Sequence, residues 1–199
     1  ETYDRTLDDI FAVQDDIASA VVKELRMTLM GDDADSLKTS GGVRAELATA
    51  AKGRGRKPEA HRLYLLARHC LERRTREDVA SGIAYLEKSL ALDPGNALAW
   101  AELGGAYSTE IDLPEAQGCR LAREAVGRAL SLEPDLAEGH AQLAGIQMFH
   151  DWDWNGAEIS LRRALQLAPG NALVLRRAGL LAVIQGRLDE GLTLTRRAV

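Results

Sequence analysis

The apolar residues before position 58 form one periodic stretch, followed by a stretch without a period. In residues 7–30 they recur every three or four positions, which is typical of one long amphipathic helix. The stripe consists of Ile10, Val13, Ile17, Val21 and Leu25. Residues 31–57 contain five glycines and keep no apolar period. The pattern therefore predicts a helical segment over 1–30 and a flexible linker over 31–57.

From residue 58 the apolar residues are periodic again, and a short motif that contains proline recurs. Leu-x-Pro occurs three times, with prolines at 94, 134 and 169, so that the spacings are 40 and then 35 residues. Each proline follows one Ala- and Leu-rich amphipathic run and precedes another, so it ends one helix and begins a turn. The repeat predicts paired helices over 59–72 and 77–92, 96–109 and 115–132, 136–149 and 155–167, and 171–185 and 188–199.

The segment after the first Leu-x-Pro resembles a tetratricopeptide repeat. Trp100, Leu103, Gly104 and Tyr107 match the large, large, small and large positions of that motif's first helix. Its second helix is matched by Ala122, Val126, Ala129 and Pro134. The resemblance implies an all-α fold, in which about four helical hairpins over 58–199 stack into a right-handed superhelix.

A narrower resemblance concerns residues 1–18, which are similar to the end of the TolB-like domain of bacterial signalling proteins. In that group the domain joins a class III adenylate/guanylate cyclase domain, or a winged-helix domain, to tetratricopeptide repeats. A chain that opens at Glu1 and stops at Val199 suggests a fragment of such a protein. The leading interpretation is an interaction and regulatory module, and the alternative is the oligomerising tail of a cyclase or a transcription regulator.

The first helices of stacked hairpins line a concave face, and we expect a protein or peptide partner to bind there. Small and apolar side chains with isolated arginines favour an apolar peptide or helix. The predicted lining consists of Tyr64, Arg68, Leu98, Ala101, Gly105, Ser108, Ala141, Gly145, Met148, Phe149, Arg176, Leu180 and Val183.

Composition and motifs give little support to other classes of function. The chain has no phosphate-binding loop, no nucleophile motif and no metal-ligand spacing, so we expect no catalysis, no cofactor and no metal. The net charge is −5, and the basic run over 52–57 lacks interleaved aromatic residues, which argues against nucleic-acid binding. The absence of a membrane-length apolar run and the two isolated cysteines favour a cytoplasmic location.

Two further expectations concern exposed apolar side chains. The stripe over 7–30 needs a cover, which predicts a homodimer, with docking of that helix back onto the repeats as the alternative. The motif Asp151-Trp152-Asp153-Trp154 occurs once, among helices. We expect Asp153 to cap the following helix and the two indoles to fill the turn before it.

Overall fold

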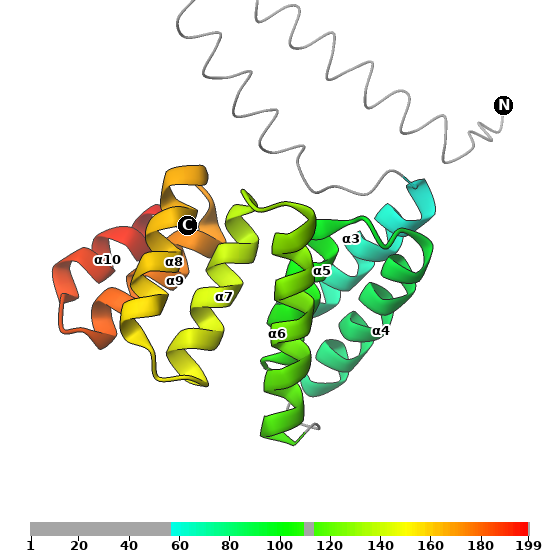
Figure 1. Cartoon of the computed structure of the whole chain (residues 1–199), viewed down its shortest axis with the longest axis horizontal. Helices are drawn as coiled ribbons and strands as arrows, with labels where there is room; N and C mark the ends of the chain where they lie inside the picture. The colour runs from blue at the N-terminus through cyan, green and yellow to red at the C-terminus, as the bar shows by residue number, and fades with distance from the viewer. Residues whose placement is uncertain (1–56, 110–113, 199) are drawn as a thin grey trace, which may run out of the picture. The chain divides into compact units, whose positions relative to one another are not determined.

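The computed structural model describes residues 57–109 and 114–198, all within one compact unit. Every regular element in these residues is a helix, and consecutive helices run in opposite directions (Figure 1). The predicted N-terminal helix, its self-association stripe and the linker lie outside the described residues. The helices are α3 (Pro58–Arg73), α4 (Arg76–Leu92), α5 (Ala97–Tyr107), α6 (Glu115–Leu132), α7 (Ala137–Phe149), α8 (Trp154–Leu167), α9 (Ala172–Ile184) and α10 (Leu188–Arg197).

The Leu-x-Pro sites end helices as the sequence predicts. At Asp93, Glu133 and Ala168 the backbone N–H still donates to a carbonyl four residues earlier, at 2.9 Å in each case. The proline that follows stops the helix, because its ring fixes φ and it has no N–H to donate. The next helix then begins beside a capping side chain at Asn96 and Asn171, whose amide oxygens accept backbone N–H bonds of the first turn.

Within each hairpin, small residues allow the two helices to approach closely. A Cβ atom added at Gly104 of α5 would lie 2.5 Å from Cγ2 of Val126 and 3.0 Å from the carbonyl oxygen of Ala122, both on α6. In the last hairpin, a Cβ added at Gly191 would lie 2.9 Å from the carbonyl oxygen of Gly179. Glycine at these crossings therefore allows the short distance between the helices. This steric requirement explains why the sequence motif has a small residue at these positions.

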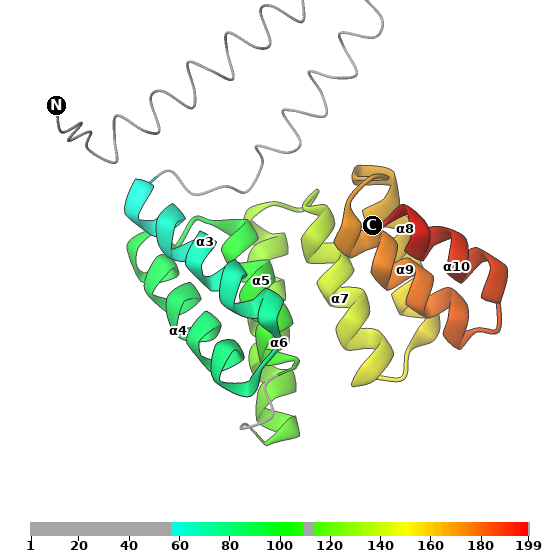
Figure 2. The same ribbon diagram turned by 180° about the vertical axis from the view of Figure 1, so that it is seen from behind.

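The hairpins stack side by side through their first helices. Helix α5 packs against α7, and α7 packs against α9, while α3 touches α5 (Figures 1 and 2). The buried residues between them are mostly Ala, Leu, Val and Ile, and they form a series of clusters from α3 to α10. This packing makes one core that passes through all four hairpins, and it sets α3, α5, α7 and α9 along a common face.

The turn between α7 and α8 differs in part from the expectation. Asp153 does cap α8, because its Oδ1 accepts the N–H of Gly156 at 2.9 Å. The prediction that the indoles fill the turn is wrong. Trp152 is 73% exposed and has a φ of 56°, and Trp154 is exposed as well. The two indoles therefore lie in solvent on either side of the capping residue Asp153.

Within residues 57–109 and 114–198, none of the helices combines the length and the apolar character needed to cross a bilayer.

Candidate functional site

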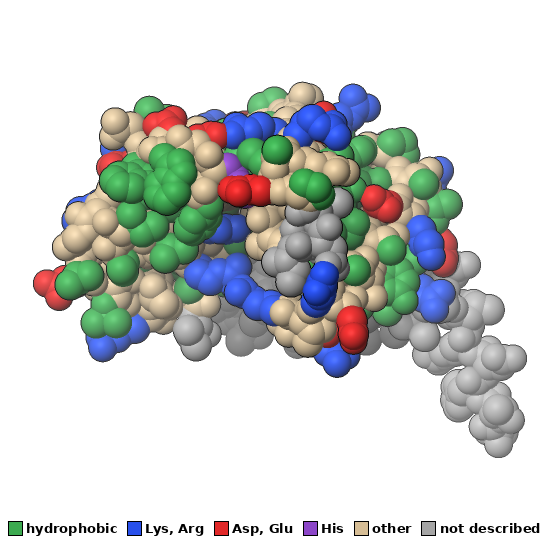
Figure 3. Space-filling view, turned by 90° about the horizontal axis from the view of Figure 1, so that it is seen from below, with side chains coloured by type: hydrophobic (Ala, Val, Ile, Leu, Met, Phe, Trp, Pro, Cys, Tyr) green, Lys and Arg blue, Asp and Glu red, His purple; other side chains and the backbone are tan. Residues whose placement is uncertain are grey.

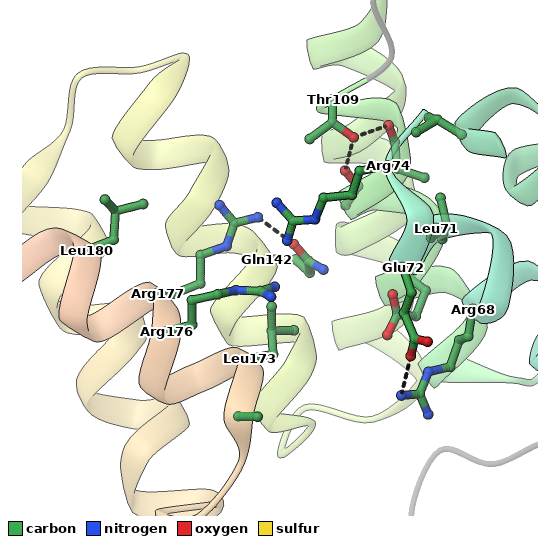
Figure 4. Close-up of a pocket in the computed structure, with 15 residues that line it drawn as sticks. Arg68, Leu71, Glu72, Arg74, Thr109, Gln142, Leu173, Arg176, Arg177 and Leu180 are labelled. Atoms are coloured by element: carbon green, nitrogen blue, oxygen red, sulfur yellow. Dashed lines mark hydrogen bonds and ion pairs between the residues drawn. The ribbon is translucent and has the colours of Figure 1, made fainter. Parts of the chain in front are cut away.

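A pocket of about 670 Å³ opens where the first helices meet. Figure 4 shows its lining, which comes from the end of α3, the start of α4, and α5, α7 and α9. Apolar and charged side chains alternate around it, so that it offers both contact area and charge. The lining residues are Arg68, Leu71, Glu72, Arg74, Val79, Glu102, Gly105, Ala106, Thr109, Gln142, Ala172, Leu173, Arg176, Arg177 and Leu180.

Three of these residues hold the same position in successive repeats. Glu102, Gln142 and Arg177 are each the sixth residue of α5, α7 and α9. Because the helices pack side by side, equivalent positions meet along the face. The side chain at this position therefore changes from a carboxylate to an amide to a guanidinium across the pocket.

The amide and the guanidinium are joined and rest on glycines. Nη2 of Arg177 donates to Oε1 of Gln142 at 3.2 Å. A Cβ added at Gly145 would lie 3.0 Å from Cζ of Arg177, and one added at Gly105 would overlap Nε2 of Gln142. The glycines on α5 and α7 thus leave room for these two long side chains to lie flat against the neighbouring helix.

On one wall of the pocket, arginines lie close to carboxylates. Arg68 and Glu72 pair along α3 at 3.8 Å. Burial raises the pKa of Glu102, and the nearby carboxylates of Glu138 and Glu72 raise it further, while Arg68 and Arg176 oppose the shift. This wall of the pocket therefore contains both signs of charge.

The opposite wall carries unbalanced positive charge. Burial, together with the neighbouring charges of Arg176 and Arg74, lowers the pKa of Arg177 to about 10. The pKa of Arg176 is lowered as well, again mainly by burial. Nε of Arg177 is buried and has no hydrogen-bond partner. A buried donor without an acceptor is unusual in proteins, and it marks this side chain as a candidate for ligand contact.

The structure separates the predicted groove residues into two groups. Arg68, Gly105, Arg176 and Leu180 line the pocket. Phe149 and Val183 are exposed and Leu98 and Ser108 are half-buried, but none of the four reaches the pocket. Five residues of the predicted groove are buried and do not line the pocket: Tyr64, Ala101, Ala141, Gly145 and Met148.

This burial corrects the predicted lining, because side chains packed between helices are not available to a partner. Ala101 and Ala141 precede the pocket residues Glu102 and Gln142 by one position, and one residue turns a helix by about 100°. Arg177, Gln142 and Glu102 were missed because of this rotation by one residue. Arg74 was missed because it follows the predicted helix over 59–72. The repeated spacing from each N-terminal cap was the signal that would have found the first three.

Comparison with known proteins gives three findings. No known family profile matches the sequence. A curated protein of Rhizobium meliloti (strain 1021), named putative adenylate cyclase 3, is 31% identical over 154 residues, which cover 72% of this chain and 23% of that protein. The chain therefore spans about a quarter of the relative's length.

Comparison with solved structures gives two further matches. A tetratricopeptide-repeat protein of Thermus thermophilus superposes with a TM-score of 0.60 at 23% identity, over 71% of this chain and 73% of that one. A crystal structure of MamA is similar with a TM-score of 0.46 at 20% identity, over 85% of this chain and 94% of that one.

The paired helices, the small residues at their crossings and the likeness to the Thermus protein agree with one another. The sequence-based expectation of stacked helical hairpins is thereby confirmed for residues 57–109 and 114–198. This part of the chain has the tetratricopeptide-repeat fold.

Proposed function

We propose that this chain is a non-catalytic interaction module, which binds a peptide or a helix of a partner protein across the face formed by α3, α5, α7 and α9. The observation that carries the proposal is the pocket itself, which is built from several repeats at once. A face of this kind offers an extended concave surface, which repeat proteins use for binding.

The chemistry of the lining supports a protein segment as the ligand. Leu71, Val79, Leu173 and Leu180 supply apolar contact area, while the charged side chains between them can fix the orientation of a bound chain. Peptide recognition commonly combines apolar anchors with a few placed polar groups. The tetratricopeptide fold agrees with the prediction that the chain is a module without catalysis of its own.

The test is selection of displayed random peptides on the 199-residue chain, followed by affinity measurement with a synthetic copy of an enriched peptide. Leu180→Glu places a charge in the apolar part of the lining and should weaken binding by about tenfold or more. Ile159→Glu is the matched control, because Ile159 is an exposed apolar residue of α8 outside the pocket. Equal binding by the wild type and Leu180→Glu would contradict the proposal.

The setting in a bacterial signalling protein is part of the proposal. It is supported by the likeness to the Rhizobium protein, whose name is that of an adenylate cyclase. In this setting the module is cytoplasmic, and it regulates an effector domain, or, as the alternative, it is the oligomerising tail of a cyclase or of a winged-helix regulator. The coding sequence that precedes Glu1 would distinguish these effectors. The homodimer through the stripe over 7–30 stays a prediction, to be checked by light scattering over a wide range of concentration.

A further inference from the structure

Three arginines from two separate elements converge in the pocket, and we name them the arginine cluster: Arg74, Arg176 and Arg177. Figure 4 shows Arg74 reaching from the end of α3 toward the two side chains of α9. Arg74 is the residue that ends α3, with a left-handed φ of 54°. A left-handed residue is normally glycine at the end of a helix, so an arginine here is unusual, and its side chain points into the pocket.

The arginine cluster has no acidic partner among the described residues. The ion pairs found there join other arginines to carboxylates, and none includes Arg74, Arg176 or Arg177. Glu102 lies close enough to attract Arg176 electrostatically but forms no ion pair with it. Arg177 makes one hydrogen bond, to the neutral amide of Gln142, and its buried Nε makes none.

Arg177 is half-buried and its Nε is fully buried, so its unpaired charge is unfavourable unless something neutralises it, while Arg74 and Arg176 are exposed side chains that line the same pocket. These three cations line one pocket and repel one another, and an anion placed between them would offset that repulsion. A guanidinium also presents its donors in a planar fork that matches the two oxygens of a carboxylate. An anion with oxygen acceptors would therefore complement the arginine cluster.

We infer that the segment bound in this groove is acidic and that it places a carboxylate, from an Asp, a Glu or a chain end, against Arg74, Arg176 and Arg177. The inference rests on the proposed function and adds the chemical class of the partner. It also changes the earlier expectation of an apolar peptide, because the apolar contacts become anchors on either side of a charge.

The remaining lining favours a peptide over a nucleic acid or a free small anion. Glu72 and Glu102 stand across the pocket and would repel a polyanion. Leu173 and Leu180 lie next to the two arginines of α9 and offer apolar contact that a small anion would leave unused. In the space-filling view of Figure 3, Lys and Arg side chains cross the middle of the molecule beside a hollow, and hydrophobic side chains gather to one side.

The experiment begins with displayed random peptides selected on the 199-residue chain. One enriched peptide is then synthesised in its acidic form and with each Asp or Glu replaced by the amide. Affinities are measured for the wild type and for the double variant Arg176→Gln/Arg177→Gln. The matched control is Arg162→Gln/Arg163→Gln, since these residues are also adjacent arginines on one helix but lie outside the pocket.

We expect enriched peptides to contain acidic residues. The double variant at 176 and 177 should bind the acidic peptide about tenfold more weakly or worse, and the control should bind it like the wild type. The amide peptide should bind both chains equally weakly, because the two changes remove the same interaction. Circular dichroism monitors folding, and Arg176→Gln alone serves as a second variant because Arg176 is exposed.

Three outcomes would overturn the inference. Enriched peptides without acids, whose binding still depends on Leu180, would leave the proposed function standing and refute the acidic partner. Inorganic phosphate or acetate that binds with the same dependence on the arginine cluster, while peptides do not bind, would show a small-anion site instead. Peptide binding that is insensitive to both Leu180→Glu and the double variant would refute the groove as well.

Discussion

Five arginines on or beside the second helices and the three arginines of the arginine cluster have opposite surroundings. On α6, α8 and the start of α10, each of five arginines has a carboxylate within reach on its own helix or on a neighbouring segment. These pairs are Arg120 with Glu124, Arg123 with Asp151, Arg162 with Glu158, Arg163 with Asp135 and Arg187 with Glu190. In the pocket, the three arginines of the arginine cluster have no such partner in the described residues.

The difference shows which arginines have no carboxylate partner among the residues that the structure describes. Exposed pairs contribute little to stability, since solvent screens them and holding two long side chains costs entropy. A buried arginine without an acid is different, because it has lost its water and gained no counter-charge. Exposed arginines such as Arg128 and Arg196 also form no ion pair among the described residues, so it is the buried, unmatched Nε of Arg177 that distinguishes the arginine cluster from the solvated surface.

The largest expected effect comes from breaking the core that holds both kinds of surface in place. Leu103 of α5 is buried and packs in the cluster that joins α3, α4, α5 and α6. Leu103→Ala should lower the free energy of unfolding by about 2–5 kcal/mol, because it removes apolar contacts and leaves a cavity. Urea unfolding followed by circular dichroism would measure it. A loss below about 0.5 kcal/mol would mean that the register of α5 is wrong.

A smaller effect, with the opposite sign, is expected at Arg177. Replacing it by Met keeps most of the apolar stem and removes a buried charge that has no acid partner. The ligand-free chain should become more stable by about 1 kcal/mol, while it loses affinity for an acidic peptide. Arg163→Met on α8 is the control and should change stability by less than about 0.5 kcal/mol. If Arg177→Met instead destabilised the chain, Arg177 would be a structural residue, and the comparison would fail.

The smallest effect concerns pH and the acid across the pocket. The folded state raises the pKa of Glu102 above its ordinary value of 4.5. A carboxyl with a raised pKa holds its proton more tightly when folded. Its contribution to stability is therefore greatest at low pH and is lost as the pH rises from 4.5 through the folded pKa.

Glu102→Gln should remove this dependence, because the amide is neutral at every pH. At pH 7 the variant should be more stable than the wild type by less than about 1 kcal/mol, and the gap should close as the pH falls toward about 4.5. The groups that face Glu102 are Arg68 and Glu72 on α3, Glu138 on α7 and Arg176 on α9. Denaturant midpoints at several pH values would test this, and a gap that widened at low pH would contradict it.

The helices were predictable from sequence for local reasons. Proline after Leu-x, capping Asn residues and alanine or glycine at the crossings act within a few residues or between adjacent helices. The site was less predictable, because a pocket lining depends on the rotation of each helix about its axis. Arg176 and Arg177 are neighbours, and the sequence alone selected the first of them. Only the packed structure shows that the second one is largely buried, lies on Gly145 and keeps an unmatched Nε.

The exposed indoles illustrate the same limit. Trp152 and Trp154 are apolar enough to suggest packing in a turn, but both indoles are exposed on either side of the Asp153 cap. A cap fixes hydrogen bonds over one turn of helix, whereas the place of a large side chain depends on what stands beside that turn.

The recurrence of one position in α5, α7 and α9 has a consequence for how such a groove can change. Glu102, Gln142 and Arg177 stand in equivalent places of successive hairpins, so the same kind of backbone position presents three different side chains to the groove. The order acid, amide, base gives the groove a polarity, and an elongated partner with an acidic end has one preferred direction along it. Exchanging the side chains of the outer two positions would weaken that polarity without reversing it, because Arg74 and Arg176 keep their positive charge at the basic end. A binding surface built from repeats can thus change its charge pattern through substitutions far apart in the chain.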